Sequence, residues 1–413
     1  MDILRFITAG SVDDGKSTLI GRLLYDSKSI LVDQLEALEK QSKNKNVDGI
    51  DLALLTDGLR AEREQGITID VAYRYFNTTK RKFIIADAPG HVQYTRNMIT
   101  GASNSSLMVI LIDARSGVIE QTRRHSIIAS LLKMHHVVVA INKMDLVEFS
   151  ENRYNEIKLD YEKVAAQLGL NNVTYISISA LNGDNIVEPS ANMPWYQERP
   201  LLQFLEEVEL TEDINHSDPR FQVQYVIRPQ TAELHDYRGY AGQIISGVYQ
   251  KGDKITVLPA GIETTLSKIE IAGEEVEEAF APQAVVLHLA DDIDVSRGDT
   301  FVHSSNQPKV ESEIEVLLCW LDNKPLIQGN KYFLQHKGRL LRTIIKEIEY
   351  KLDVNTLEHT AVMDNVKLNE VVKVKIKTAQ PLVFDSFDKN SDYGNAILID
   401  ETSNSTVAAV LLN

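Results

Sequence analysis

One short segment near the start of the chain constrains its fold more than any other. Residues 10–17 read Gly-Ser-Val-Asp-Asp-Gly-Lys-Ser, which matches the pattern G-x-x-x-x-G-K-S/T. The preceding residues, 4–9, form an apolar run typical of a buried strand, and residues 16–25 have the pattern of a helix. A strand, this loop and a helix in that order predict an α/β domain whose loop wraps a chain of phosphates.

The residue types in this loop suit phosphate binding, because glycines let the backbone approach and the helix N-terminus presents positive dipoles. We expect Lys16 to reach the β- and γ-phosphates and the Ser17 hydroxyl to ligate Mg²⁺. The residues expected to contact the nucleotide are Gly10, Ser11, Val12, Asp13, Asp14, Gly15, Lys16, Ser17 and Thr18. The carboxylates of Asp13 and Asp14 are unfavourable beside phosphate unless one binds a monovalent cation or points away, and the sequence leaves both options open.

The first half of the chain alternates strand and helix patterns. The expected strands are residues 4–9, 69–76, 82–86, 107–112, 137–141 and 173–178. The expected helices are residues 16–25, 92–101, 120–134, 153–168 and 200–208. Apolar strands that alternate with helices predict a mainly parallel sheet with helices on both faces.

The second half consists of short β-rich runs separated by turns, which predict barrels or sandwiches. The runs are residues 221–227, 239–248, 254–258, 263–271, 283–289, 300–302, 312–321, 331–336, 339–350, 370–378 and 395–400. Polar segments at 212–219 and 304–311 indicate boundaries. We therefore expect three domains, at roughly 150 residues per domain: residues 1–212, a barrel at 213–306 and a second barrel at 307–413.

Two further segments fit a site that senses the terminal phosphate. Asp87 begins an Asp-Ala-Pro-Gly run after a predicted strand, so it is expected to hold Mg²⁺, with the amide of Gly90 on the γ-phosphate. Thr68 is expected to give its hydroxyl to Mg²⁺ and its amide to the γ-phosphate. The order of such segments depends on the γ-phosphate, so they can act as a switch.

The run Asn142-Lys143-Met144-Asp145 follows a predicted strand and suits recognition of guanine. A carboxylate at Asp145 can accept hydrogen bonds from N1–H and the 2-amino group, which adenine does not offer. We expect Lys143 to lie over the base and Asn142 to buttress the loop and reach N7. The segment Ser179-Ala180-Leu181 follows the last strand and is expected to present backbone amides to guanine O6.

Hydrolysis of a nucleotide requires a positioned water molecule. His91 directly follows Gly90, so its side chain could orient that water while the γ-phosphate accepts the proton. The expected catalytic residues are His91, Lys16 and Thr68. Val12 and Ile67 could flank His91 as an apolar gate, or they could simply contribute to ordinary packing.

Composition narrows the protein class. The 59 acidic side chains outnumber the 43 basic ones, for a net charge of −16, which argues against broad nucleic-acid binding but does not exclude a local basic patch. A single cysteine excludes a disulfide framework and fits a reducing cytosol. No apolar run approaches the roughly 18 residues of a membrane span, and we see no secretory signal. We expect a cytoplasmic protein without a membrane partner.

The chain resembles the translational GTPase superfamily along nearly its whole length. Residues 62–69, Glu-Arg-Glu-Gln-Gly-Ile-Thr-Ile, are similar to the effector-loop signature of elongation factors Tu and 1-alpha, and residues 242–247, 252–255, 257–259 and 297–299 follow the pattern of their second domain. Other strings resemble the large, GTPase subunits of bacterial sulfate adenylyltransferase. These strings are residues 11–18, 90–98, 113–117, 121–125, 192–196 and 237–242.

This resemblance implies a P-loop GTPase domain followed by two β-barrels, with GTP and Mg²⁺ as cofactors. It also implies a partner, the small subunit of ATP-pyrophosphatase type, which transfers the adenylyl group of ATP to sulfate. The large subunit then hydrolyses GTP to drive this uphill reaction, in a heterodimer or higher assembly. Some relatives carry a fused adenylylsulfate kinase. This chain has one P-loop motif, so we expect none here.

Two other functions remain open from the sequence. One is an elongation-factor-like GTPase that delivers aminoacyl-tRNA, which the negative charge weakens without excluding. The other is a GTPase switch that recruits a partner without energetic coupling. Outside the nucleotide site, we expect Cys319 and Trp320 to pack inside a barrel and residues 80–82, Lys-Arg-Lys, to form a solvated hairpin turn.

Overall fold

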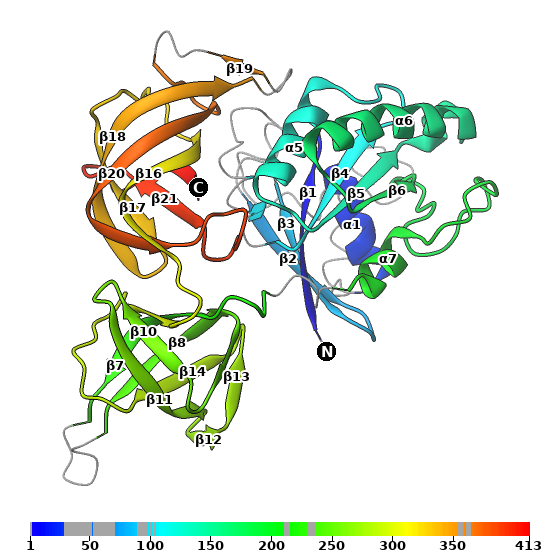
Figure 1. The fold of residues 1–413 in the computed structure, drawn as a ribbon. Helices are drawn as coiled ribbons and strands as arrows, with labels where there is room; N and C mark the ends of the chain where they lie inside the picture. Colours follow the sequence, from blue (N-terminus) through cyan, green and yellow to red (C-terminus); the bar gives the residue numbers. More distant parts are fainter. Residues whose placement is uncertain are drawn as a thin grey trace. The chain divides into compact units, whose positions relative to one another are not determined.

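The computed structural model describes residues 2–28, 52, 71–88, 98, 101–102, 105–209, 215–229, 237–353, 358–360 and 365–413. The chain forms two compact units, Met1–Leu210 and Thr211–Asn413, and each is described by itself (Figure 1). Within the described ranges, no helix has both the length and the apolar character needed to cross a membrane.

The first unit is built around a sheet with the strand order β2-β3-β1-β4-β5-β6. Its strands are β1 (Ile3–Ala9), β2 (Ala72–Asn77), β3 (Lys82–Asp87), β4 (Leu107–Asp113), β5 (His136–Asn142) and β6 (Val173–Ser177). All neighbours pair in parallel except β2 and β3, which form an antiparallel hairpin at one edge. The central strand β4 is buried along its whole length, as expected for a strand covered on both faces.

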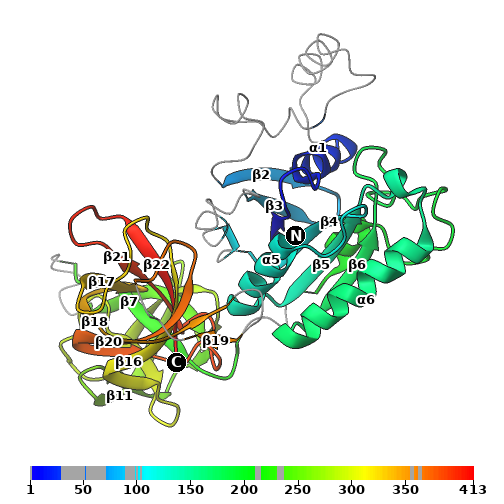
Figure 2. The ribbon, with the colours of Figure 1, turned by 90° about the horizontal axis from the view of Figure 1, so that it is seen from above.

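Helices cover both faces of this sheet, as the sequence predicted. Within the described residues the helices include α1 (Lys16–Asp26), α5 (Glu120–Leu131), α6 (Glu151–Leu168), α7 (Leu201–Glu207) and the 3-10 helix η3 (Met144–Val147). Helix α1 lies on one face and α5 and α6 lie on the other (Figure 2). Helix α6 begins two residues before its predicted start because Ser150 caps it, accepting from the Arg153 amide at 3.3 Å. Most of the helix predicted at 92–101 lies outside the described residues.

The turn between β2 and β3 differs from the prediction. Arg81 is buried, not solvated, and its guanidinium donates to the carboxylate of Asp2 at 2.7 and 3.0 Å. It also donates to the carbonyl oxygens of Leu205 at 3.0 Å and Val208 at 2.7 Å, where α7 ends. A basic residue in a polar turn carries no local sign of these distant partners, so the sequence pattern suggested exposure.

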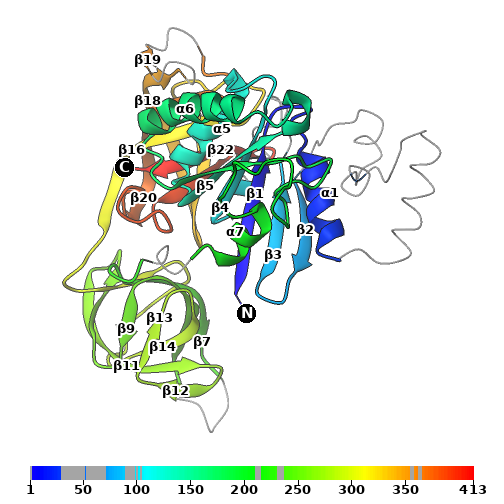
Figure 3. The ribbon, with the colours of Figure 1, turned by 90° about the vertical axis from the view of Figure 1, so that its right-hand side faces the viewer.

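The second unit begins with a barrel that closes through the pairing of β10 with β11. Its strand order is β10-β15-β7-β8-β14-β11, with β12 added to β11, and β9 pairs with β13. The strands are β7 (Arg220–Ile227), β8 (Gly239–Ser246), β9 (Val248–Gln250), β10 (Lys254–Leu258), β11 (Ile262–Ile271), β12 (Glu274–Val276), β13 (Glu278–Phe280), β14 (Ala284–Leu289) and β15 (Thr300–His303). Phe221, Tyr240 and Phe301 are buried inside the ring of strands seen in Figure 3.

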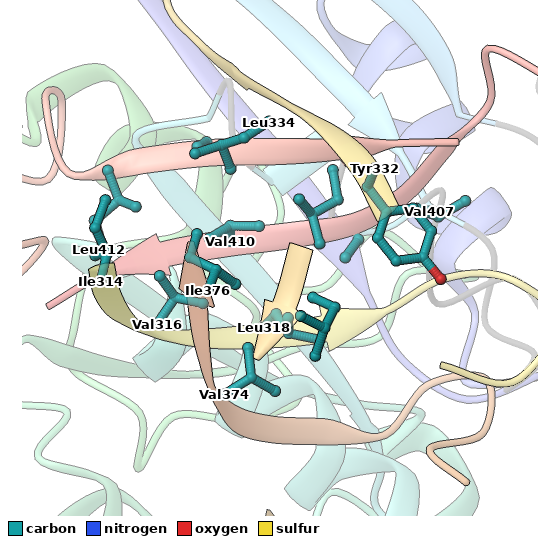
Figure 4. Packing of buried hydrophobic residues seen from close by; sticks show 14 of the residues in the cluster. Ile314, Val316, Leu318, Tyr332, Leu334, Val374, Ile376, Val407, Val410 and Leu412 are labelled. Carbon is teal, nitrogen blue, oxygen red and sulfur yellow. The ribbon is translucent and has the colours of Figure 1, made fainter. Parts of the chain in front are cut away.

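A second barrel follows and closes through the pairing of β17 with β18, in the order β17-β21-β22-β16-β20-β18, with β19 added to β18. Its strands are β16 (Lys309–Trp320), β17 (Lys331–His336), β18 (Arg339–Leu352), β19 (His359–Thr360), β20 (Val371–Phe384), β21 (Asn395–Ile399) and β22 (Thr406–Leu412). Alternate residues of β16, including Ile314, Val316 and Leu318, point into its core (Figure 4). β22 is absent from the strands predicted from the sequence, because its continuous apolar run with two alanines lacks the alternation typical of a strand.

The sequence correctly placed Cys319 and Trp320 in a barrel wall, since both are buried. Burial raises the pKa of the Cys319 thiol to about 12, so it stays protonated and unreactive at neutral pH. The predicted boundary at 304–311 covers the residues between β15 and β16 and also the first three residues of β16. The division into three domains stays a prediction.

A buried ion pair joins the two barrels of the second unit. Arg220 on β7 is fully buried, and its guanidinium donates to both carboxylate oxygens of Asp385 at 2.7 and 3.0 Å. It also donates to the carbonyl oxygens of Pro219 at 2.8 Å and Asn306 at 2.9 Å. Asp385 directly follows β20, so this bidentate ion pair fixes one barrel to the other.

Candidate nucleotide-binding site

The chain topology brings the predicted site residues that the structure describes to one edge of the sheet. Parallel strands end on the same side, so the loop after β1 lies beside the ends of the other strands. Asp87, Asp113 and Asn142 are the last residues of β3, β4 and β5. The sheet therefore collects, at its carboxyl edge, side chains that are far apart in the sequence.

The loop between β1 and α1 holds its lysine in a fixed position. Lys16 is buried, and its ammonium group donates to the carbonyl oxygens of Gly10 at 2.9 Å and Ser11 at 2.8 Å. Burial lowers the pKa of Lys16, which neighbouring carboxylates, Asp87 foremost, partly offset. Gly15 precedes α1 with a φ of 95°, and a side chain there would collide with the amide of Asn142. The loop thus places a buried cation at a helix N-terminus, where an anion binds favourably.

The two adjacent carboxylates of this loop have different surroundings. Asp14 is buried and accepts a hydrogen bond from the Ser11 amide at 2.5 Å, so it stabilises the loop from inside. Its burial raises its pKa, although that hydrogen bond and Lys16 act in the opposite direction. Asp13 is exposed with a φ of 69°, and its carbonyl oxygen accepts from Lys143. Asp14 therefore serves the loop's own backbone, whereas the role of Asp13 toward a cation stays a prediction.

The residues expected to hold magnesium are only partly described. Asp87 is almost fully buried and accepts from the Thr8 hydroxyl at 3.4 Å, while Ser17 lies in the first turn of α1. Hydroxyl and carboxylate oxygens are the hard donors that Mg²⁺ prefers, so both residues fit this cation. Thr68, Gly90 and His91 lie outside the described residues.

Asn142 joins the phosphate loop to the loop that follows β6. Its side-chain amide donates to the carbonyl oxygen of Asp14 at 2.8 Å, and its side-chain oxygen accepts from the Ala180 amide at 2.9 Å. The side chain is 2% exposed, so water does not compete for these hydrogen bonds. The buttressing that the sequence analysis expected of Asn142 is thus present in the geometry.

The loop after β5 is held by a carboxylate that the sequence analysis did not select as a site residue. Lys143 has a φ of 62° and forms an ion pair with Asp113 at 3.0 Å. Although partial burial raises the pKa of Asp113, hydrogen bonds from Arg115 and Lys143 lower it to about 2. Its position at the end of an apolar strand was the available signal, because such ends line ligand sites in parallel sheets.

The remaining residues that were predicted to recognise the base lie next to each other. The Ser179 hydroxyl donates to Asp145 at 2.5 Å, which orients that carboxylate. Ala180 is buried beside Asn142, while the side chain of Leu181 is 66% exposed. The structure therefore brings Asn142, Asp145 and the segment 179–181 together at one place, which fits the predicted base pocket.

The P-loop, its buried lysine and the clustered base loops define a GTP-binding protein of the elongation factor type. The family model "Elongation factor Tu GTP binding domain" matches residues 1–217, and "GTP-eEF1A C-terminal domain-like" matches residues 313–412. The chain is 53% identical to "Sulfate adenylyltransferase subunit 1" of Bacteroides fragilis, covering 100% of this chain and 86% of that protein. The chain therefore belongs to the sulfate adenylyltransferase subunit 1 family.

A second relative agrees with this assignment, and a solved structure agrees with the fold. The "Bifunctional enzyme CysN/CysC" of Mycobacterium tuberculosis is 52% identical over 98% of this chain and 66% of its own length. A solved structure, the Ski7 GTPase-like domain of S. cerevisiae bound to GDP and inorganic phosphate, is similar with a TM-score of 0.53. It covers 100% of this chain and 97% of that chain at 16% identity, so it supports the fold alone. The predicted fold class, an α/β GTPase domain followed by two β-barrels, is confirmed.

Proposed function

We propose that this chain is the GTPase subunit of sulfate adenylyltransferase. In this function, GTP hydrolysis drives the conversion of ATP and sulfate to adenosine 5'-phosphosulfate and pyrophosphate. The observation that carries the proposal is the clustering of Asn142, Asp145 and residues 179–181 beside the phosphate loop. It occurs in a chain that is 53% identical, over its full length, to a protein named as that enzyme's subunit 1. The proposed partner is the small subunit of ATP-pyrophosphatase type, in a heterodimer or higher assembly in the cytoplasm.

The phosphate loop is proposed to bind the nucleotide through residues 10–18. Lys16 contacts the β- and γ-phosphates, since its buried ammonium group is already positioned by two carbonyl oxygens. Mg²⁺, when bound, neutralises phosphate charge, and Ser17, Thr68 and Asp87 are the residues that would hold it. The amide of Gly90 would report the presence of the γ-phosphate to the segment that follows it.

The base pocket is proposed to select guanine. Asp145, oriented by Ser179, accepts from N1–H and the 2-amino group, while Lys143 covers the base and Asn142 reaches N7. The segment Ser179-Ala180-Leu181 lies at guanine O6 and donates to it through the Leu181 amide, since the Ser179 amide donates to the Asp184 carbonyl oxygen and the Ala180 amide to the Asn142 side chain. An adenine nucleotide would leave the carboxylate without its donors, which lowers affinity.

Hydrolysis is proposed to use His91 to orient the attacking water, with Lys16 and Thr68 stabilising the charge that develops on the γ-phosphate. His91 directly follows Gly90 and lies four residues after Asp87 in the sequence. This closeness in the sequence supports the proposed role of His91 beside the γ-phosphate.

A coupled assay tests the proposal. The full chain is purified with the small subunit, and formation of adenosine 5'-phosphosulfate is measured with GTP, with GDP and without guanine nucleotide. We expect product formation to depend on GTP and to stop when a non-hydrolysable GTP analogue replaces it. Product formation at the same rate without GTP would contradict energetic coupling. Nanomolar, GTP-dependent retention of aminoacyl-tRNA in a filter-binding titration would instead support an elongation-factor-like function.

A further inference from the structure

Arg22 connects the phosphate-binding helix to the loop that follows β6. It lies on α1, six residues after Lys16, and its side chain is 19% exposed. Its guanidinium donates from Nε to the carbonyl oxygen of Ala180 at 3.3 Å and from Nη2 to the carbonyl oxygen of Leu181 at 2.5 Å. One side chain therefore holds two consecutive carbonyl groups of the loop proposed to read guanine O6.

The loop itself is a tight turn whose outer surface packs on Arg22. The amide of Ser179 donates to the carbonyl oxygen of Asp184 at 3.2 Å, and the amide of Gly183 donates to the carbonyl oxygen of Ser179 at 2.8 Å. Gly183 has a φ of 88°, and a Cβ built on it would lie 3.8 Å from the Arg22 side chain. The turn is thus closed by its own backbone and backed by the arginine.

Ala180 is held on both sides of its backbone. Its amide donates to the side-chain oxygen of Asn142 at 2.9 Å, and its carbonyl oxygen accepts from Arg22. In a trans peptide the C=O and the following N–H point in opposite directions. Arg22 draws the Ala180 carbonyl toward α1, so it directs the Leu181 N–H away from α1. That direction is fixed before any nucleotide binds.

We propose that Arg22 is a positioning residue for guanine recognition, because it fixes the direction of the Leu181 amide that donates to O6. The inference rests on the proposed guanine site and goes beyond it by assigning a residue that does not touch the base. An arginine suits the task, since its planar fork donates to two neighbouring carbonyl groups at once. The i,i+4 contact to Asp26 at 3.7 Å holds the guanidinium from the other side.

Equilibrium binding of GDP, IDP and ADP to the full chain tests this role. IDP keeps O6 and N1–H but lacks the 2-amino group, whereas ADP lacks O6. We expect Arg22→Ala to raise the dissociation constants of GDP and IDP by the same factor, about tenfold, and to leave that of ADP unchanged. The ratio of the GDP to the IDP dissociation constant therefore stays constant, while the ratio of the GDP to the ADP dissociation constant rises about tenfold, which is a loss of preference for guanine. Arg22→Lys keeps one donor and should recover part of the loss.

Arg199→Ala is the matched control, because Arg199 forms an exposed ion pair with Glu207 at 2.8 Å. It should change none of the three constants. An unchanged GDP/ADP ratio in Arg22→Ala, or an equal loss for all three nucleotides in both Arg22 variants, would overturn the positioning role. A wild-type chain that binds ADP as tightly as GDP would instead refute the guanine site itself, which separates the two failures.

Discussion

Each unit of the molecule contains a buried cation, and the two have opposite surroundings. Arg220 is fully buried between the barrels, and Asp385 takes both of its parallel hydrogen bonds. Lys16 is buried in the phosphate loop, and its hydrogen bonds go to neutral carbonyl oxygens. A buried charge destabilises the fold unless it is paired. Arg220 is paired with a carboxylate inside the protein, whereas Lys16 can still pair with an anion that binds to the loop.

The largest expected effect comes from the completed pair. Arg220→Met should lower the free energy of unfolding by about 3–5 kcal/mol, because Asp385 stays buried without its main counter-charge. Urea denaturation followed by circular dichroism measures this change. The double variant Arg220→Met/Asp385→Leu should recover most of the loss. A loss below about 1 kcal/mol in the single variant is typical of an exposed ion pair. It would show that Arg220 is no more important for stability than Lys16.

Substitution of Lys16 should have the opposite result, a large loss of binding and a small change in stability. Lys16→Met should weaken GTP binding about 100-fold, since a charged donor to two phosphates is lost. The unfolding free energy should change by no more than about 1 kcal/mol, because the hydrogen bonds of Lys16 go to backbone carbonyl oxygens. Titration calorimetry and urea denaturation provide both numbers, and Lys163→Met, at an exposed pair with Asp160, is the control. Unaltered GTP affinity would refute the proposed role of the loop.

A smaller effect on binding is expected at the base pocket. Asp145→Asn should weaken GTP about 30-fold and favour xanthosine triphosphate, because an amide donates where the carboxylate accepted. The Ser179 hydroxyl can still donate to the amide oxygen, so the loop is expected to stay folded. Competition of both nucleotides against fluorescent GDP measures the preference. If the variant retained full preference for GTP, the assignment of Asp145 to the base would be wrong.

The smallest effect concerns acid stability. The pKa of Asp113 is lowered to about 2, so its unfolded carboxyl, with a pKa near 3.9, binds protons more readily than the folded one. The stabilisation that the ionised Asp113 carboxylate adds to the folded state is therefore complete above about pH 4 and is lost as the pH falls toward 2. Asp113→Asn should flatten the pH dependence of the unfolding free energy in that window. A profile that still matches the wild type would show that the carboxylate adds nothing to stability.

Local sequence patterns predicted much of the first unit, because its characteristic residues occur together in short segments of the sequence. The loop at 10–17, the boundaries of α1 and the clustering of Asn142 with Ala180 all follow from a motif and the rule that parallel strands end together. The partners of Arg81 and Arg220 could not be predicted in this way. Each lies more than 80 residues from an atom it contacts, and a single basic residue carries no local signal of such a contact.

The barrels show the same limit at the level of strands. β22 runs between β21 and β16 and completes the ring, yet its sequence has no alternation to mark it. Which of its side chains point into the barrel is decided by its pairing with β21 and β16, and its own sequence pattern does not show it. Asp113 is a similar case in the site, because its importance depends on Lys143, which is 30 residues further along the chain.

The bridge made by Asn142 has a consequence for how a nucleotide binds. One rigid carboxamide donates to the phosphate loop and accepts from the base loop, so ordering either loop lowers the entropy lost in ordering the other. A carboxylate in its place would have no donor, and an ammonium group would have no acceptor. The binding free energy of a guanine nucleotide, which joins base and phosphates in one molecule, should therefore be more favourable than the sum of the binding free energies of guanosine and pyrophosphate.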